Sequence, residues 1–490
     1  MNAPHPHWTP IATPAAHFIA NRWIPAAGGG TLPMIDPSDG APFATIARGG
    51  AADVDAAVHA AQGAREGAWG RMAPADRGRV LAKVGRAIAD QADELTGIEA
   101  RDCGKPIAQA RADVLACARY FEFYAGACDK LHGATLPYPD GYTVLTWREP
   151  HGVTGHVIPW NYPLQIFGRS VGGALAAGNA CVVKPAEDAC LSLLRVAEIA
   201  AGVGLPPGAL NLVTGLGAEA GAALAAHRGI AHLSFTGSPA TGALVAAAAA
   251  IRHCPVTLEL GGKSPQIVFA DADLDAALPA LVNAIVQNAG QTCSAGSRLL
   301  VQQEIYEPLL ARLGERFRAL RAGPALADLD CGPLIRRSQQ ARVQGFLTAA
   351  ARDGIATVAQ GSIAADAPEG GYYAAPTLLR DVPAAHPLAC DEVFGPVLAA
   401  MAFGDEADAL RLANATDYGL VAGVWTRDGA RQLRMARAVQ SGQVFVNNYG
   451  AGGGVELPFG GVKHSGYGRE KGFEALYGFT TVKTVVLRHG

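Results

Sequence analysis

The chain has 490 residues, of which 50% are hydrophobic and 17% are charged, and its formal net charge is −3. This composition is that of an ordinary globular protein, and the length indicates two or three domains. The small net charge gives no electrostatic reason to expect nucleic acid or a membrane as a partner. The nine cysteines are scattered and include no CxxC pair, which argues against a disulfide framework and a zinc site. We therefore predict a cytoplasmic protein that holds no metal.

The first 16 residues are predicted to form a flexible tail rich in proline. They contain no basic region followed by an apolar core, so we expect no signal peptide. The longest apolar run, residues 243–251, falls far short of the roughly 18–20 residues that cross a bilayer. This run predicts a buried helix instead.

Short strands followed by helices are predicted for the first quarter of the chain. Residues 18–48 alternate short apolar runs with turn signals, which is typical of small strands at a domain edge. Helices are then expected over three stretches: 51–64, 74–103 and about 108–131. In the first of them, Val54, Val58 and Ala61 share one face.

From residue 142 the pattern changes to alternating strands and helices. The expected strands are "TVLTWREP", "GVTGHVIPW", "ACVVKP", "LNLVTG" and "IAHLSFTG", with helices at "RSVGGALAAGN" and near 189–203. Such alternation predicts a parallel sheet with helices on its faces. A second alternating unit begins after about 258, with strands at "PQIVFA", "RLLVQ", "GVWTR" and "GQVFVNN", and the tail "GFTTVKTVVLR" is again strand-like.

One cysteine lies in an unusual setting, the segment "QNAGQTCSAGSR" from Gln287 to Arg298. A cysteine in a packed core usually has large apolar neighbours. The neighbours of Cys293 are instead Gly, Ala, Ser and Thr, so the pattern indicates that another molecule must come close to the sulfur.

The turns after the parallel strands are candidate binding segments, because parallel sheets bind ligands at the carboxyl ends of their strands. Lys184 and Glu187 follow one strand; such a pair suits ribose hydroxyls, and its alternative is a surface ion pair. The turn Thr236–Gly242 enters a helix and offers N–H groups to a phosphate. This turn is not GxGxxG, and Gly215–Gly217 is only a fragment of that pattern, so either could be an ordinary turn.

Two further polar residues suit catalysis. Glu259 ends an apolar strand, where burial should raise the pKa of its carboxyl and suit it to general base catalysis; a helix cap or a salt bridge is the alternative. Asn161 carries an amide that could stabilise an oxyanion, and an Asx-turn is the alternative. The absence of HExxH and GxSxG motifs disfavours metallohydrolases and serine hydrolases.

Seven motifs, in their order and spacing, resemble the aldehyde dehydrogenase superfamily, in a general pattern like that of betaine aldehyde dehydrogenases. They are "PWNYP", "KPAE", "FTGS", "LELGGKSP", "GQTCSAGSR", "EVFGP" and "PFGGVKHSGYGRE". The resemblance implies an α/β fold with a Rossmann-like NAD-binding domain, an α/β catalytic domain and a small β element for oligomerisation. The implied boundaries are 17–126 and 148–258 for the first, 259–465 for the second, and 127–147 with 466–490 for the third.

The resemblance also implies roles for individual residues. Cys293 would attack the aldehyde carbon, Asn161 and the Cys293 N–H would hold the oxyanion of the thiohemiacetal, and Glu259 would activate the water that hydrolyses the thioester. The implied cofactor is NAD, and Glu187 points to NAD over NADP. The implied cofactor-binding residues are Ile158, Pro159, Trp160, Lys184, Glu187, Gly217, Phe235, Gly237, Ser238, Leu260, Glu392 and Phe394.

The chain departs from the family pattern in two places. Relatives commonly carry an aromatic residue and a lysine where this chain has Arg169 and Ser170, and that lysine pairs with the glutamate matching Glu470. We expect Arg169 to be a solvated arginine at the rim of the substrate entrance; the alternative is that its positive charge favours a substrate with a carboxylate. Residues 452–454 are glycines where many relatives place a bulky aromatic side chain, which predicts a roomier pocket that favours bulky aldehydes.

The predicted function is hydrolytic, NAD-dependent oxidation of an aldehyde to a carboxylic acid by a homodimer or homotetramer. One alternative is a CoA-acylating relative, which is disfavoured because such enzymes generally lack the glutamate matching Glu259. Another is a non-catalytic binding protein on the same fold. A cysteine protease or acyltransferase fits less well, because no histidine lies in a motif that would activate Cys293.

Overall fold

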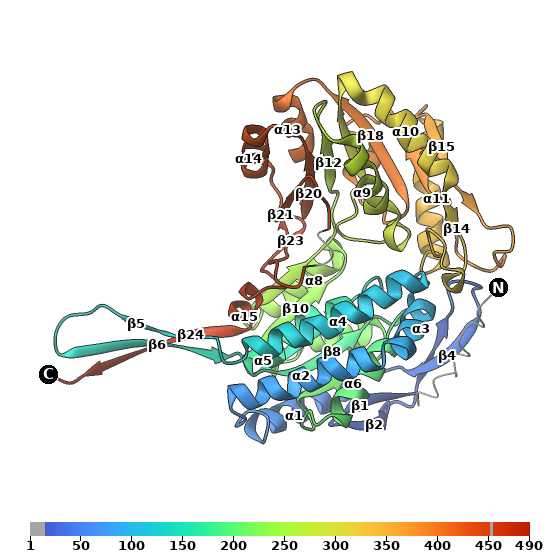
Figure 1. Ribbon diagram of the computed structural model, residues 1–490. Helices are drawn as coiled ribbons and strands as arrows, with labels where there is room; N and C mark the ends of the chain where they lie inside the picture. Colours follow the sequence, from blue (N-terminus) through green and yellow to red (C-terminus); the bar gives the residue numbers. More distant parts are fainter. Residues whose placement is uncertain (1–14, 451–453) are drawn as a thin grey trace.

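The computed structural model, which describes residues 15–450 and 454–490, has two lobes and a protruding arm (Figure 1). A sheet of eight strands forms the centre of the lower lobe, and a sheet of seven strands forms the centre of the upper lobe. The predicted flexible tail, residues 1–16, falls almost entirely outside the described residues.

The first sheet has a parallel centre, as the alternation of strands and helices predicts. The antiparallel strands β1 and β2 lie at one edge and β23 at the other. Across the sheet the strands are β2 (Arg22–Pro25), β1 (Ala16–Ile19), β9 (Leu210–Leu212), β8 (Ala180–Pro185), β7 (Val153–Ile158), β10 (His232–Thr236), β11 (Val256–Glu259) and β23 (Gly466–Tyr467). The helices of this lobe are α1 (Ala51–Glu66), α2 (Pro74–Asp90), α3 (Ala92–Cys103), α4 (Ile107–Ala127), α5 (Pro163–Ala177), α6 (Leu191–Gly202), α7 (Ala222–Ala226) and α8 (Pro239–Ala250).

The second sheet is parallel except for its edge strand β15. Its strands are β15 (Thr357–Gln360), β17 (Thr377–Leu379), β18 (Val397–Phe403), β13 (Arg298–Gln302), β12 (Pro265–Val268), β20 (Val421–Trp425) and β21 (Gln443–Val446). The longer helices of this lobe are α9 (Leu274–Val286), α10 (Tyr306–Ala319), α11 (Arg337–Arg352), α13 (Glu406–Asn414) and α14 (Gly429–Ala438). Each sheet has its own apolar core, so each lobe buries its apolar residues independently of the other.

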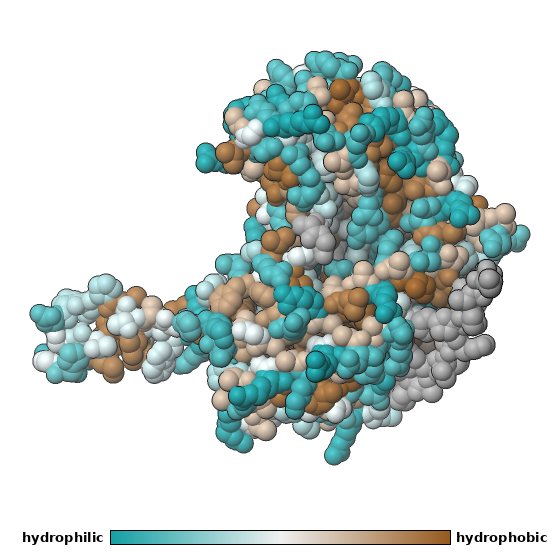
Figure 2. Space-filling view, viewed as in Figure 1, coloured by the Kyte–Doolittle hydropathy of each residue, from teal (hydrophilic) through white to brown (hydrophobic). Residues whose placement is uncertain are grey.

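The arm is an antiparallel sheet of β5 (Ala134–Leu136), β6 (Tyr142–Pro150) and β24 (Thr480–Arg488), which extends away from the lower lobe (Figure 1). β6 and β24 pair along their whole length. Trp147, Val482 and Val486 are about half exposed on this arm, and Figure 2 shows brown patches along it. An isolated three-stranded sheet buries little on its own, so these side chains are available to another surface.

Small elements complete the fold. They are the strand pairs β3 (Thr31–Ile35) with β4 (Pro42–Ala47), β14 (Arg321–Ala322) with β16 (Ser362–Ile363) and β19 (Tyr418–Gly419) with β22 (Val462–Lys463), and the helices α12 (Pro387–Cys390) and α15 (Glu474–Gly478). The structure confirms the predicted strands and the first helix, whose Val54, Val58 and Ala61 are buried.

Three predictions about helices were wrong in detail. The stretch 74–103 is two helices, because Gln91 leaves the helical region (φ −106°, ψ 22°) and acidic residues begin a new first turn after it. The helix predicted to reach residue 131 ends at Ala127. The run 243–251 is helical but not buried, since Leu244 is 72% exposed and Ile251 is 87% exposed. Alanine favours helix even without burial, so an apolar run of this kind does not require a core position.

Candidate active site

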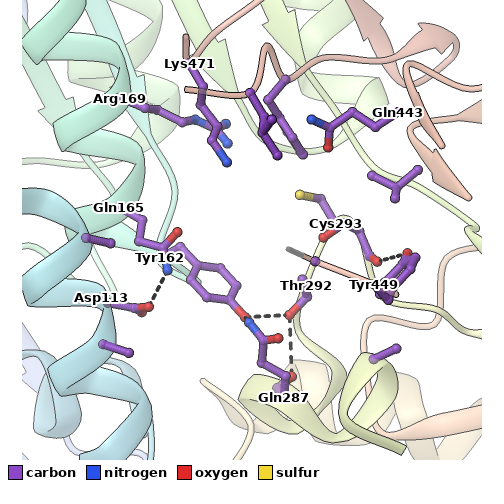
Figure 3. Close-up of a pocket in the computed structure, with 18 of the residues that line it drawn as sticks. Asp113, Tyr162, Gln165, Arg169, Gln287, Thr292, Cys293, Gln443, Tyr449 and Lys471 are labelled. Carbon is purple, nitrogen blue, oxygen red and sulfur yellow. Dashed lines mark hydrogen bonds between the residues drawn. The ribbon is translucent and has the colours of Figure 1, made fainter. Parts of the chain in front are cut away.

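A cavity of about 400 Å³ lies between the lobes, next to Cys293 (Figure 3). Helices α4 and α5 supply one wall, and α9, the loop before β13 and the segment after β20 supply the other. Its polar and charged lining residues are Gln109, Asp113, Tyr120, Tyr162, Gln165, Arg169, Asn283, Gln287, Thr292, Ser294, Gln443, Tyr449 and Lys471. The volume is that of a small-molecule site, and the thiol of Cys293 borders it.

The Cys293 loop is held by an unusual backbone conformation. Asn288 and Ala289 have φ angles of 49° and 52°, a left-handed conformation that costs a non-glycine residue about 1 kcal/mol. The side chain of Asn288 donates to the carbonyl of Asn161 at 2.9 Å and so ties the loop to the other lobe. A Cβ on Gly262 would collide with the carbonyl of Cys293, so glycine is required for this close approach. The thiol is thus positioned by both lobes.

Cys293 is partly exposed, but its immediate surroundings disfavour a charged sulfur. Burial raises the pKa of the Cys293 thiol to about 11, and the nearby Arg169 opposes this increase only in part. At neutral pH the free enzyme therefore holds a thiol at this position. Nucleophilic attack requires removal of that proton by a base or by a change on substrate binding.

Glu259 ends β11 and is buried, with 2% of its surface exposed. Neither carboxyl oxygen receives a hydrogen bond from a residue in the described part of the chain. Burial raises its pKa well above the ordinary value, with Arg169 acting in the opposite direction. The prediction of a raised pKa is confirmed in direction. Glu259 does not line the cavity itself, although its charge acts on the Cys293 thiol.

Asn161 follows β7 and is also buried. Its amide nitrogen donates to the carbonyl of Gln291 at 3.0 Å, and its second amide hydrogen has no acceptor among the described residues. The next residue, Tyr162, contacts the hydroxyl of Thr292 at 2.8 Å. Two neighbouring side chains therefore reach the two residues that precede Cys293.

The predicted ribose contacts meet at the carboxyl end of β8. Lys184 Nζ lies 2.6 Å from a carboxylate oxygen of Glu187, and the other oxygen accepts a weak bond from the N–H of Gly217 at 3.4 Å. Burial acts to raise the pKa of Glu187, but the ion pair with Lys184 lowers it overall. The carboxylate is therefore charged at neutral pH, as discrimination against a phosphate requires.

The remaining predicted cofactor-binding residues lie at the same edge of the first sheet or face it. Those at the ends of β7, β10 and β11 are Ile158, Pro159, Trp160, Phe235, Gly237, Ser238 and Leu260. Gly237 has to be glycine, since a Cβ there would lie 2.7 Å from the ring of Phe235. Ser238 caps α8 by accepting from the N–H of Thr241 at 3.3 Å.

Glu392 and Phe394 reach this edge from the upper lobe. One oxygen of Glu392 accepts from the N–H of Gly262 at 2.9 Å, and the ring of Phe394 packs edge-on against Trp160 with 5.4 Å between the centroids. The other Glu392 oxygen receives no hydrogen bond from the described residues and is open to a hydroxyl group. Two carboxylates, an exposed helix N-terminus and two aromatic rings at one sheet edge fit a dinucleotide.

Arg169 is not the solvated rim residue that we expected. It is 6% exposed, and its Nε lies 2.5 Å from an oxygen of the fully buried Glu470. It therefore replaces the lysine that pairs with this glutamate in relatives. Arg169 stays buried beside Glu470 because separating the two side chains would leave each charge unpaired. The two residues are far apart in the sequence, so their pairing could not be predicted from it.

A chain of buried side chains supports Glu470 from behind. Its second oxygen accepts from Ser234 at 2.5 Å, Ser234 accepts from Ser170 at 2.9 Å, and the Ser170 hydroxyl lies 2.6 Å from Nδ1 of His156. Since each serine donates toward Glu470, Nδ1 of His156 carries the hydrogen that Ser170 accepts. Ser170 thus has a different role from the lysine of relatives, because it acts on Glu470 only through Ser234 and carries no charge.

Replacing Glu470 with alanine is expected to destabilise the protein by about 3–5 kcal/mol, because Arg169 would remain buried without its partner. The matched control is Glu219→Ala, which breaks an arginine pair of the same 2.5 Å length that is exposed to solvent. Thermal unfolding of both variants checks this: the Glu470 variant should melt several degrees lower and the control should barely change. Equal shifts would contradict the buried pair as a source of stability.

The predicted open entrance at residues 452–454 falls largely outside the described residues, which omit 451–453. Beside that segment, Tyr449 lines the cavity and donates to the carbonyl of Ser294 at 2.5 Å. No helix within the described ranges is long and apolar enough to cross a membrane. No group of three or more His, Cys, Asp or Glu side chains in those ranges could hold a metal ion.

The chain is similar to known proteins both in sequence and in structure. A model of the aldehyde dehydrogenase family matches residues 23–485. A betaine aldehyde dehydrogenase from Cereibacter sphaeroides is 43% identical over 485 residues, which is 98% of each chain. A crystal structure of a putative aldehyde dehydrogenase from Burkholderia cenocepacia is 70% identical, with a TM-score of 0.97 over 97% of this chain and 100% of that one.

A solved NAD⁺ complex of an aldehyde dehydrogenase from Bacillus cereus is 37% identical, with a TM-score of 0.94 over 97% of both chains. The cofactor in that structure agrees with the fit of a dinucleotide to the sheet edge described above. The predicted α/β fold is confirmed by these likenesses. Sequence, fold and site together place the chain in the aldehyde dehydrogenase family, whose members oxidise aldehydes with a nicotinamide cofactor.

Proposed function

We propose that this enzyme oxidises its aldehyde by a hydrolytic route in which Cys293 is the nucleophile, Asn161 the oxyanion donor and Glu259 the base. The observation that carries the proposal is what surrounds Cys293: a strained loop, a buried amide that bonds to this loop, and a buried carboxyl that acts electrostatically on the thiol and has no hydrogen-bond partner among the described residues. Unsatisfied buried groups and strained backbone gather at functional sites, because the fold retains them despite their cost.

The chemistry balances over two stages. The Cys293 thiol releases its proton to solvent, and the sulfur bonds to the carbonyl carbon while the carbon–oxygen double bond becomes a single bond to an oxyanion. The Asn161 amide and the Cys293 N–H hold that oxyanion. Loss of hydride from that carbon leaves a thioester. NAD, when bound, supplies the hydride acceptor. Glu259 then removes a proton from water, whose oxygen displaces the sulfur and releases the carboxylic acid.

The positions of the two sheets and of the arm support the proposed roles of three domains. Residues 17–126 and 148–258 contain the first sheet, whose carboxyl edge holds Lys184 and Glu187 for the ribose, so we assign the cofactor to this lobe. Residues 259–465 contain the second sheet and Cys293 and form the proposed catalytic domain. Residues 127–147 and 466–490 include the arm, and they form the proposed oligomerisation element.

The assembly we propose is a homodimer or homotetramer in the cytoplasm. Its support is the row of exposed apolar side chains on the arm, which includes Trp147, Val482 and Val486. A second copy of the chain would remove that surface from water and would pair the free edge of the sheet. The nine cysteines, none of which forms a disulfide among the described residues, suit a reducing compartment.

The route is tested by following NADH at 340 nm with a panel of aldehydes, with and without CoA. We expect NADH and a free carboxylic acid in the absence of CoA, because Glu259 provides a base for water. Production of an acyl-CoA, together with no turnover in its absence, would favour the CoA-acylating alternative. Cofactor binding without any NADH on the panel would favour the non-catalytic alternative.

NAD should be preferred over NADP, and Glu187→Gln should narrow the preference. The carboxylate of Glu187 is held by Lys184 at the position proposed for the ribose hydroxyls, where a 2′-phosphate would meet a like charge. Removing a repulsion of about 1.4 kcal/mol would raise the affinity for NADP, relative to that for NAD, roughly tenfold. Ratios of kcat/KM for the two cofactors measure this.

The matched control for the cofactor prediction is Glu198→Gln on α6, which removes an exposed carboxylate that pairs with Arg195. The control should keep the wild-type ratio of NAD to NADP. A wild type that prefers NADP, or a Glu187 variant that keeps the full preference for NAD, would contradict the assignment.

A further inference from the structure

Three glutamine side chains line the aldehyde cavity, and each is held through its amide nitrogen. Gln165 lies on α5, Gln287 follows α9 and Gln443 begins β21. Their nitrogens donate to a carboxylate oxygen at 2.5 Å, a tyrosine hydroxyl at 2.7 Å and a backbone carbonyl at 2.7 Å, respectively. None of the three amide oxygens accepts a hydrogen bond from a residue within 15–450 or 454–490. The cavity wall therefore presents hydrogen-bond acceptors to a bound molecule.

Gln165 has the most firmly fixed orientation of the three. Its nitrogen bonds to Asp113, which is 3% exposed and also contacts the fully buried ammonium of Lys105. Burial acts to lower the pKa of Lys105, but its acidic neighbours, Asp113 first among them, raise it overall, so the ammonium is charged. A carboxylate only accepts hydrogen bonds, so the amide cannot turn its oxygen toward Asp113. Figure 3 shows the Gln165 oxygen on the side of the open space.

The buried charges also make the Gln165 oxygen a better acceptor. Lys105, Asp113 and Gln165 form one chain in which each contact polarises the next, and the chain ends at the amide oxygen. Burying such an ion pair is costly, yet the fold retains it at the cavity wall. A partly exposed oxygen of this kind bonds to water in the free enzyme. A substrate without a donor would displace that water and leave the oxygen unpaired.

The charged residues of the lining do not favour an ionic substrate. Asp113 pairs with Lys105, and Arg169 pairs with the buried Glu470. Lys471, the third charged residue in the described lining, is not free either. An ammonium or a carboxylate that lost its water here would therefore meet no unpaired opposite charge. A neutral donor can bond to an amide oxygen without that cost.

A hydroxyl group suits the mixture of amide groups in the lining. Gln109 is held in the opposite sense to the other glutamines, because its oxygen accepts from the N–H of Asn288 at 2.8 Å and its nitrogen is left without an acceptor among the described residues. A hydroxyl both donates and accepts, so it can bond to either kind of amide atom, whereas an ammonium only donates.

We infer that the substrate is a hydroxylated aldehyde, whose hydroxyl group donates to the Gln165 oxygen while its aldehyde carbon reaches Cys293. This inference rests on the proposed function, which assigns the aldehyde end to Cys293. The cavity of about 400 Å³ accommodates such a molecule, and the rings of Phe445 and Phe459 offer apolar contact for the part between its two ends. Gln165 is thus a residue that determines specificity.

The test compares aldehydes of nearly equal size and shape that differ in one hydroxyl group. One pair is 4-(hydroxymethyl)benzaldehyde with 4-ethylbenzaldehyde, and the other is 3-hydroxypropanal with butanal. In at least one pair the hydroxylated aldehyde should have a kcat/KM at least about tenfold above that of its alkyl partner, because the alkyl group leaves the amide oxygen unpaired. The difference should lie mainly in KM. 3-Aminopropanal, which carries an ammonium at neutral pH, should be a poorer substrate than 3-hydroxypropanal.

Gln165→Met keeps an unbranched side chain of similar length but removes the acceptor, and it should reduce the ratio of hydroxylated to alkyl aldehyde about tenfold. Gln344→Met, on the exposed face of α11, is the matched control and should keep the ratio. Should Gln165→Met fail to fold, Gln165→Asn replaces it. This variant keeps an amide but withdraws its oxygen by one methylene, so it should lower the ratio in the same direction.

A wild-type ratio near one in both pairs, or a preference for 3-aminopropanal over 3-hydroxypropanal, would overturn the hydroxylated substrate while leaving aldehyde oxidation intact. A folded Gln165 variant that keeps the full ratio would overturn the role of Gln165. Absence of NADH with every aldehyde, hydroxylated or not, would instead contradict the proposed function on which the inference rests.

Discussion

Replacing Cys293 with alanine is expected to reduce aldehyde oxidation by at least about 10⁴-fold while NAD still binds. Removal of a nucleophile eliminates the covalent route, and enzymes that lose one typically lose activity on this scale. Alanine fits the loop, because it is smaller than cysteine and the Cys293 carbonyl, which packs on Gly262, is unchanged. The measurement is steady-state NADH formation beside calorimetric titration with NAD.

Cys254→Ala is the control for this variant, because Cys254 is also partly exposed but lies after α8 and away from the cavity. It should keep wild-type activity. Iodoacetamide gives an independent measure on the wild type. Since burial raises the pKa of Cys293 to about 11, labelling of the free enzyme should accelerate roughly tenfold per pH unit between pH 7 and 9. A folded Cys293→Ala enzyme that still oxidises aldehydes would refute the assignment.

Replacing Glu259 with glutamine should leave a burst of about one NADH per site but slow the steady state by about 10²–10⁴-fold, the usual contribution of a general base. Hydride leaves before water attacks, so a missing base stalls the enzyme at the thioester. Glutamine should also preserve the fold, because it has nearly the same shape as glutamate and burial already disfavours the charged carboxylate. Rapid-mixing measurements of NADH separate the burst from later turnovers.

The pH dependence gives a second check on Glu259. A base whose pKa is raised by burial is ionised only at higher pH, so wild-type turnover should fall as the pH drops through that pKa. The glutamine variant should lack this acid limb in its residual rate. Equal loss of the burst and the steady state would show that Glu259 acts before hydride transfer, for example on the Cys293 thiol.

The sequence by itself determined the elements and the identity of the residues at the strand ends. Alternating apolar runs and helical segments predicted two parallel sheets, because strand and helix periods are local properties of the chain. Glu187, Ser238 and Glu259 were identifiable because each lies at the end of a strand or shortly after it, and strand ends are where a parallel sheet binds ligands. The small residues around Cys293 were likewise visible without a fold.

The sequence pattern did not predict which residues of a helix would be exposed to solvent. The alanine-rich stretch that forms α8 is helical by propensity, but its exposure depends on which elements lie beside it. The break at Gln91 is not marked by a proline or a glycine, and only the backbone conformation of Gln91 shows where α2 ends and α3 begins. Propensity describes each residue alone, whereas burial depends on the whole chain.

Only the tertiary structure decided the electrostatics of the site. It brings Arg169 of α5 against Glu470, hundreds of residues later in the chain, so an arginine expected in solvent is buried and paired. It also places Lys471 beside Arg169 on the cavity wall and leaves Glu259 without a hydrogen-bond partner among the described residues. Charge interactions depend on distance and on the loss of water, and neither quantity is encoded in the order of residues along the chain.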